Sequence, residues 1–276
     1  TPGYGSSSLN WKRKDKTMID QWKKGAKYWD NAFNPVIGCE KVSEGCANCY
    51  AEAMCKRFPA LNGYEFRPKV KFGSKPPKTG VVFVGNMTDL FRDWNRLTEI
   101  YEWLHILSPN ARNLILTKRA GTIRDLPDEL LQLDHVFYGV TAENQDRLEY
   151  RVTQLMKSGA KRKWISIEPL LGPLNIAPYL LTEHQKRGFD NQYIAPECKW
   201  QYNDKLDWVV VGAESGSNRR PCKLEWIESV VDDCLEWDVP VFVKQLDMNG
   251  KLVTDINKFP EHLQIRQVPW MERAGR

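Results

Sequence analysis

The sequence has no long apolar run, few histidines and no internal repeat. No stretch of its 276 residues reaches the roughly 18 consecutive apolar residues of a membrane-spanning helix. The amino-terminal residues are polar and basic, without the apolar centre of a secretory signal. These absences argue against a membrane protein, a secreted protein and a repeat array. We therefore expect a cytoplasmic protein with no membrane partner.

The composition is that of one globular domain. Hydrophobic residues make up 42% of the chain and charged residues 27%, which is enough to bury a full core. A net charge of +5 and a pI of about 8.7 permit an anionic partner. We expect a basic extension over residues 1–28, a barrel domain over 29–246 with insertions at 59–80 and 182–206, and a carboxyl-terminal tail over 247–276.

Six continuous apolar segments have the length of buried strands and are rich in β-branched residues. Helical patterns, with apolar residues every three or four positions, lie between most of them. "FNPVIG", before the first cysteines, could supply a further strand. This alternation predicts an α/β fold, a TIM-like parallel (β/α) barrel that is partial, with six or seven strands; a doubly wound open sheet is the alternative. The six segments begin at Val81, Asn113, Val136, Lys163, Trp208 and Val239.

Polar side chains follow each of these segments. The carboxyl ends of parallel strands face one crevice, where ligands bind in such folds. Helix capping is the alternative role for Thr88, Asp89, Asn144 and Ser215. The residues in question are Asn86, Thr88, Asp89, Thr117, Lys118, Arg119, Glu143, Asn144, Glu168, Glu214, Ser215, Lys244 and Gln245.

Glu168 is the most informative of these residues. It lies between "WISI" and "PLLG", where an unpaired carboxylate would be costly. Cations gathered at a barrel mouth attract carboxylates and phosphates, although a solvated loop end is the commoner fate of a lysine. We expect Glu168, Glu214 and Lys118 to have catalytic roles.

Three of the seven cysteines stand in one short loop, "NPVIGCEKVSEGCANCYAE". In a reducing compartment, close cysteines are more often metal ligands or catalytic groups than disulfides. Cys39, Cys46 and Cys49 have the spacing C-x6-C-x2-C, and no histidine is near them in sequence. Cys55 would lie on roughly the opposite side of a helix from Cys49. The fourth ligand position of a metal centre is therefore open.

An open position on a thiolate-held centre suits a [4Fe-4S] cluster whose fourth iron binds a substrate or cofactor. Radical S-adenosylmethionine chemistry uses such a cluster. The alternative is a non-catalytic, zinc-stabilised nucleic-acid-binding protein with one further ligand. The other cysteines, Cys198, Cys222 and Cys234, have no partner at useful spacing, and Cys234 falls on an apolar helix stripe.

Over about residues 29–246 the chain resembles a phage and prophage protein family of uncharacterised function, which is itself similar to the radical S-adenosylmethionine superfamily. The motifs, in order, are the cysteine loop, "NMTDLF", "LTKR", "GVTAENQ", "SIEPLLGPL", "DWVVVGAESG", "RP" at Arg220 and "VPVFVKQ". The loop departs from the superfamily's usual C-x3-C-x2-C. The aromatic residue that normally precedes the last cysteine is Asn48 here, and Tyr50 follows it.

The resemblance implies a function and a set of partners. Cys39, Cys46 and Cys49 would ligate the cluster, and S-adenosylmethionine would lie across the strand ends. The protein would work in a phage-infected or prophage-bearing bacterium, with an electron donor such as flavodoxin or ferredoxin and with room for a protein partner. The expected cofactor-binding residues are Asn86, Thr88, Asp89, Thr117, Glu143 and Tyr50.

Four basic segments interleave cations with aromatic or apolar residues: "WKRKDK" from Trp11, "WKKGAKYW" from Trp22, "RPKVKFGSKPPK" from Arg67 and "KRK" from Lys161. Such mixtures suit nucleic-acid backbones and bases, although any one of them can be a solvated surface. Together they favour a nucleic acid or nucleotide as substrate, with base modification as the reaction.

Overall fold

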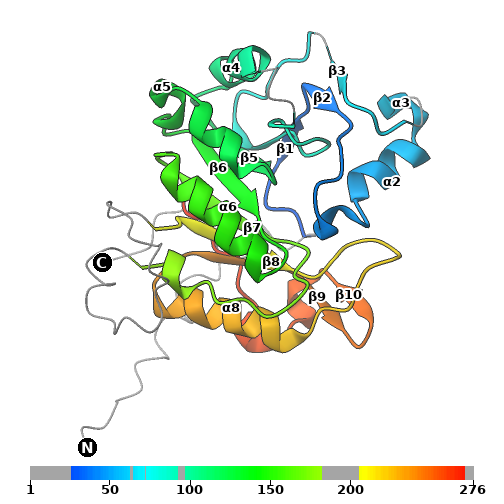
Figure 1. Cartoon of the computed structure of the whole chain (residues 1–276). Coiled ribbons are helices and arrows are strands. Elements are labelled where there is room, and N and C mark those ends of the chain that lie inside the picture. Colours follow the sequence, from blue (N-terminus) through cyan, green and yellow to red (C-terminus); the bar gives the residue numbers. More distant parts are fainter. Residues whose placement is uncertain (1–25, 63–64, 72, 93–96, 182–204, 271–276) are drawn as a thin grey trace, which may run out of the picture.

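The computed structural model describes residues 26–62, 65–71, 73–92, 97–181 and 205–270 (Figure 1). Its centre is an eight-stranded sheet in which the first seven strands are parallel and β10 is antiparallel. The order is β1-β4-β5-β6-β7-β8-β9-β10. The strands are β1 (Asn31–Phe33), β4 (Gly80–Val84), β5 (Ala111–Thr117), β6 (Val136–Thr141), β7 (Lys163–Ile167), β8 (Trp208–Gly212), β9 (Val241–Met248) and β10 (Lys251–Val253).

Each strand of the sheet pairs with the next one along the chain, and the sheet curls into a half-barrel. A doubly wound sheet instead reverses its strand order at a switch point. The prediction of a partial TIM-like barrel is confirmed, and six of the strands stand where the apolar segments predicted them. Because all the parallel strands end on one rim, their following residues come together there.

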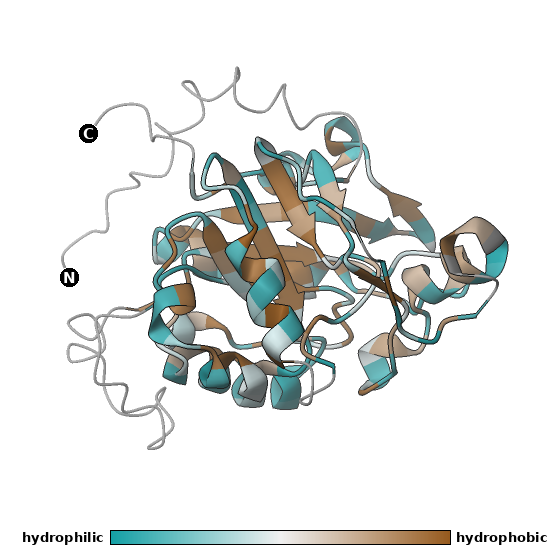
Figure 2. Cartoon of the chain, turned by 90° about the horizontal axis from the view of Figure 1, so that it is seen from above, coloured by the Kyte–Doolittle hydropathy of each residue, from teal (hydrophilic) through white to brown (hydrophobic). Residues whose placement is uncertain are grey.

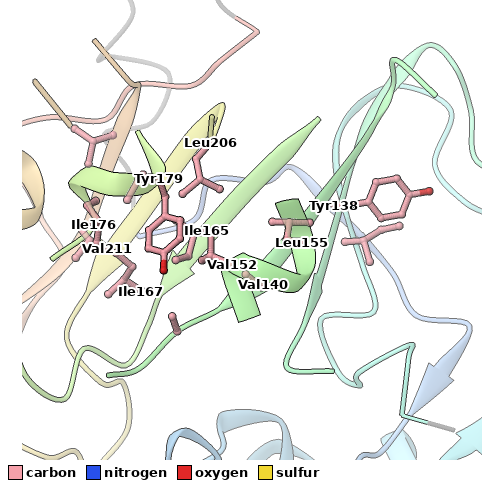
Figure 3. Packing of buried hydrophobic residues seen from close by; sticks show 14 of the residues in the cluster. Tyr138, Val140, Val152, Leu155, Ile165, Ile167, Ile176, Tyr179, Leu206 and Val211 are labelled. Carbon is pink, nitrogen blue, oxygen red and sulfur yellow. The ribbon is translucent and has the colours of Figure 1, made fainter. Parts of the chain in front are cut away.

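Helices cover the outer face of the sheet (Figure 1). In α6, the Asn144 side chain caps the first turn by accepting a hydrogen bond from the Arg147 backbone N–H, at 3.0 Å. The same helix buries Val152 and Leu155 against β6 and β7 (Figure 3). The helices are α4 (Leu97–His105), α5 (Asp128–Leu131), α6 (Gln145–Lys157) and α8 (Leu224–Glu236). The 3-10 turns of this part of the chain are η5 (Ala120–Asp125), η6 (Ala177–Tyr179), η7 (Ile256–Lys258) and η8 (Glu261–Leu263).

The two faces of the sheet carry different side chains. Figure 2 shows largely apolar strands beside helices of mixed colour. Outward residues such as Ile165 and Ile167 pack under the helices, while inward residues form a separate aromatic cluster. That cluster holds Trp164 and Trp208, whose ring centroids lie 5.2 Å apart. Since side chains alternate along a strand, the inward row of β7 continues from Trp164 to Ser166 and then Glu168. The interior therefore turns polar toward the carboxyl ends.

A small antiparallel sheet and two helices stand beside the half-barrel (Figure 1). The segment "FNPVIG" forms the end of β1 and then β2, and β2 pairs with β3. The elements beside the half-barrel are β2 (Val36–Ile37), η3 (Glu44–Cys46), α2 (Tyr50–Arg57), α3 (Pro59–Asn62) and β3 (Lys69–Val70). Of these, α3 and β3 lie in the segment 59–80, which we predicted as an insertion.

The chain beyond residue 246 contributes to the same core. It completes β9, forms β10 and buries Leu263 and Ile265. The buried Arg266 donates hydrogen bonds to the backbone oxygens of Lys244 and Thr254, at 3.1 and 2.8 Å. Part of the predicted tail thus packs on the sheet. Residues 1–25 and 182–204 lie outside the described residues. Within the described part, the helices are all too short or too polar to cross a bilayer.

Candidate functional site

One pocket opens at the carboxyl ends of the strands, between them and the cysteine loop, defined here as residues 38–49. It has a volume of about 1070 Å³, part of it open to solvent. Of the residues predicted from the sequence, its lining includes Cys39, Cys46, Cys49, Tyr50, Asn86, Thr88, Asp89, Thr117, Lys118, Glu168 and Glu214.

The three loop cysteines are partly exposed free thiols in this pocket. Burial and the negative charge of Asp89 raise the pKa of Cys39 above its usual value. Cys46 Sγ lies 3.9 Å from the hydroxyl of Ser43. Across the described residues, no three histidine, cysteine or acidic side chains are arranged around a single metal ion. The three thiols nevertheless line the same pocket.

The remaining described cysteines do not form part of the pocket lining. Cys55 is fully buried beside Ile37, Ala51 and Met87. Burial raises the pKa of Cys222 to about 12 and that of Cys234 well above its usual value. Cys198 lies outside the described residues.

Tight backbone packing fixes the start of the cysteine loop. Gly38 has φ +99°, and a Cβ there would lie 2.2 Å from the backbone oxygen of Arg67. Only glycine fits this conformation and this contact. The Gly38 carbonyl accepts a hydrogen bond from the Thr88 hydroxyl at 2.6 Å, and the Cys39 N–H donates to the Phe66 carbonyl at 3.0 Å. Thr88 thus holds the backbone beside Cys39.

Glu44 and Gly45 tie the middle of the loop to α6 and β6. The Glu44 carboxylate pairs with Arg147 at 3.2 Å and accepts a hydrogen bond from the Asn144 side chain. Hydrogen bonds from its own backbone N–H and from Arg147 lower the pKa of Glu44 to about 2. The Gly45 N–H donates to Glu143 at 3.4 Å, and a Cβ on Gly45 would lie 2.8 Å from the Glu143 carboxyl carbon.

Glu143 lies behind the loop and is fully buried. Its carboxylate pairs with Arg151 at 2.7 Å, and Arg151 also donates to the Thr141 carbonyl at 2.8 Å. Glu143 does not line the described pocket. Its predicted contact with a cofactor stays a prediction, while its hydrogen bonds in the structure go to Arg151 and to the loop backbone at Gly45.

Asn48 ties the end of the loop to β8. Its amide donates to Glu214 at 3.0 Å and to the Asn218 carbonyl at 2.8 Å. The Arg220 guanidinium donates to both Glu214 oxygens, at 2.5 Å to Oε1 and at 3.0 Å to Oε2, the oxygen that Asn48 also contacts. Burial alone would raise the pKa of Glu214, but hydrogen bonds from Arg220 and Asn48 outweigh it and hold that pKa below its usual value. The sequence did not predict these contacts. It indicated Arg220 only as part of the "RP" motif, and Asn48 only because it replaces the usual aromatic residue.

Asp89 organises the rim of β5. Its carboxylate accepts hydrogen bonds from the Thr117 hydroxyl at 2.7 Å and the Lys118 N–H at 2.9 Å, and it pairs with Arg119 at 3.2 Å. The Thr117 hydroxyl in turn accepts from the Arg119 N–H. Asp89 and Thr117 are therefore hydrogen-bonded to each other, although both also line the pocket.

Charged groups form the floor of the pocket. Glu168 lies 3.0 Å from the Lys244 ammonium and accepts a hydrogen bond from Ser166 at 3.2 Å. Lys244 also lies 5.8 Å from the ring centroid of Tyr28. Burial and the Glu168 carboxylate raise the pKa of Tyr28 well above its usual value. The sequence argument that Glu168 needs a partner is met by Lys244, which lies within β9 (Val241–Met248) and not after a strand as the sequence predicted.

Replacing Asn48 by alanine should loosen the carboxyl-terminal half of the loop. The change removes two hydrogen bonds, each worth about 1 kcal/mol, so alkylation of Cys46 and Cys49 should be roughly fivefold faster or more. Iodoacetamide labelling followed by mass spectrometry, on chelator-treated protein, measures this rate. Asn257→Ala, which removes a hydrogen bond between Asn257 and Asp255, is the matched control. Equal labelling rates in the two variants would show that Asn48 does not anchor the loop.

Comparison with known proteins gives one family and one solved structure. Residues 23–260 match the family described as "Protein of unknown function (DUF5131)". No curated protein matches the chain. The solved structure is described as "Spore photoproduct lyase complexed with dinucleoside spore photoproduct", with a TM-score of 0.39 and 13% sequence identity. The match covers 66% of this chain and 55% of that one, so the chain spans about half the length of the lyase. A likeness at this level carries no argument about activity.

Proposed function

The chain belongs to the DUF5131 family of proteins of unknown function, and from its own site we propose that it is a radical S-adenosylmethionine enzyme. This match confirms the prediction that the chain belongs to a family of uncharacterised function. A phage origin stays a prediction.

One observation carries the proposal. Three free thiols line one pocket at the carboxyl-terminal rim of a parallel half-barrel, and its described lining includes no histidine and no fourth cysteine. A structural zinc site needs four ligands around a single point. In a [4Fe-4S] cluster each thiolate binds a different iron, so three cysteines can be the full set of protein ligands. A zinc site would need a further ligand, and the described lining offers no histidine or fourth cysteine for it.

Cys39, Cys46 and Cys49 would hold the cluster, and their anchored loop sets its place over the pocket. When bound, the cluster supplies an electron for reductive cleavage of the sulfonium bond of S-adenosylmethionine. Asn86, Thr88 and Tyr50 line the pocket and are among the proposed cofactor contacts. The Tyr50 hydroxyl donates to the Asn86 carbonyl, which fixes the two residues relative to each other.

The floor of the pocket has a separate role in the proposal. Glu168 and Lys244 present opposite charges at the bottom of the site and can orient a polar substrate. Lys118 lines the same pocket as a further cation. The proposed substrate is a nucleic acid or nucleotide that undergoes base modification. An external donor such as flavodoxin or ferredoxin would supply the electron.

Anaerobic purification followed by iron and sulfide analysis tests the proposal. We expect iron and acid-labile sulfide in equal amounts and release of 5′-deoxyadenosine from S-adenosylmethionine after reduction. Stoichiometric zinc in protein never exposed to oxygen, or a full cluster that neither binds nor cleaves the cofactor, would rule the enzyme out.

Lys244→Ala should slow turnover by about tenfold or more without loss of iron, because misplacement of bound groups slows enzymes on this scale. The measurement is the rate of 5′-deoxyadenosine release per cluster. Lys258→Ala, at an exposed lysine of η7, is the control. Unchanged turnover in Lys244→Ala would show that the pair of Glu168 and Lys244 does not orient the substrate.

A further inference from the structure

Exposed apolar side chains gather on one small part of the molecule. Of the seven large hydrophobic residues that are exposed in the described chain, four lie between residues 42 and 58. Tyr50, Met54 and Phe58 follow one another at intervals of four, on and just after α2, and are 39–46% exposed. Residues four apart share one helix face. Single exposed apolar residues are normal, but a stripe of this kind marks an interaction surface.

The stripe begins in the pocket. Val42 and Tyr50 are exposed and also line it, so the apolar surface is continuous from the cysteine loop outward along α2. At a rise of 1.5 Å per residue, the helix carries the stripe about 12 Å away from the pocket. A ligand lying on this face would therefore reach the site with one end.

The same region carries an excess of positive charge. Residues 50–80, from the start of α2 to the start of β4, contain seven lysines and arginines and two glutamates, an excess of five in a chain whose net charge is +5. One of the glutamates, Glu52, pairs with Lys56 at 2.7 Å. Arg57 lies 5.1 Å from the ring centroid of Phe58. Lys69 and Lys71 are exposed on and after β3, and Phe66, just before β3, packs against the cluster that holds Ala51 and Cys55 of α2. This part of the molecule thus combines exposed aromatic and methionine side chains with lysines and arginines.

We propose that this surface, the outer face of α2 with β3, binds single-stranded nucleic acid and presents one nucleotide to the pocket. Cations match the phosphate backbone, while Tyr50, Met54 and Phe58 offer contacts to base faces. A single strand is required because bases inside a duplex cannot reach such side chains or a pocket. That the presented nucleotide is the substrate rests on the proposed function; the binding itself does not.

The test is binding of a fluorescein-labelled 12-nucleotide single strand to the full chain, measured by anisotropy at several salt concentrations. We expect wild-type affinity to fall steeply with salt. Lys69→Glu/Lys71→Glu should weaken binding about tenfold or more and make the salt dependence shallower, by roughly 0.7 in slope for each lost phosphate contact. Met54→Ala/Phe58→Ala should weaken binding about fivefold or more with an unchanged slope, because stacking is not ionic.

Matched controls lie at the opposite end of the sheet. Arg112→Glu, at the amino end of β5, and Ile106→Ala, just before that strand, should bind as wild type does. Polyglutamate serves as an anion without bases, and Met54→Ala/Phe58→Ala should leave its binding unchanged. Wild-type affinity in both α2–β3 variants, equal losses in the controls, or equal sensitivity of polyglutamate to the apolar variant would overturn the proposal.

Binding is measured with and without the cluster loaded. If the chain binds the strand yet assembles no cluster, the binding surface is supported and the proposed enzyme function is contradicted. If the chain cleaves S-adenosylmethionine yet binds no strand, the enzyme function is supported and the single-stranded substrate is contradicted.

Discussion

Alanine at Cys39, Cys46 or Cys49 should abolish cluster assembly. Each of these thiols lines the pocket as a free cysteine, and no other cysteine or histidine of the described lining could replace it. Iron bound after anaerobic purification and reconstitution should fall to background in each single variant, together with the visible absorption and the spin-resonance signal of the reduced protein. Because the loop is anchored by several hydrogen bonds that avoid the thiols, the variants should still unfold cooperatively.

The other cysteines provide the controls. Cys55→Ala, Cys222→Ala and Cys234→Ala should keep full iron content, since these side chains are buried and do not line the pocket. Cys198→Ala, at a position outside the described residues, should also keep it. Each buried variant is expected to lose some stability through the cavity that it creates. Loss of iron in Cys55→Ala would contradict the open coordination position, because it would identify a fourth thiol ligand.

The fold could be predicted because its signals are local. A strand buried on both faces is a short apolar run, and an amphipathic helix repeats its apolar residues every three or four positions. The strand β6 (Val136–Thr141) shows the first pattern, and the helix α6 (Gln145–Lys157) shows the second. The segment 59–80 shows neither, because β3 is two residues long and exists only by pairing with β2. No local pattern encodes such a strand.

The sequence could predict which residues gather at the site, but not which of them pair with one another. Strand-end placement gathers polar residues at one rim, and most of those predicted do line one pocket. Which groups pair there depends on contacts across the chain. Asp89 bonds to Thr117, and Asn48 reaches Glu214. These partners are far apart in sequence, so spacing alone could not show that some predicted ligand contacts also hold the rim and the loop together.

Glu143→Ala should cause the largest loss of stability among changes near the site. The substitution leaves the Arg151 guanidinium buried without its carboxylate, and breaking a buried pair from one side costs about 3–5 kcal/mol. Urea unfolding followed by tryptophan fluorescence measures the loss. Glu225→Ala, which breaks the exposed pair between Lys223 and Glu225, should change the free energy of unfolding by about 1 kcal/mol or less.

A double variant separates support of the fold from contact with a cofactor. Glu143→Leu/Arg151→Met removes both charges and should recover most of the stability lost in Glu143→Ala, because an apolar pair of similar volume tolerates burial. If Glu143 acts only through the Gly45 backbone, S-adenosylmethionine should then bind the loaded double variant within a few-fold of wild type. If stability returns while cofactor binding is lost, Glu143 is a cofactor contact as the sequence predicted, and the loop must move to expose its buried carboxylate. Failure of the double variant to recover stability would contradict the assignment of the cost to an unpaired Arg151.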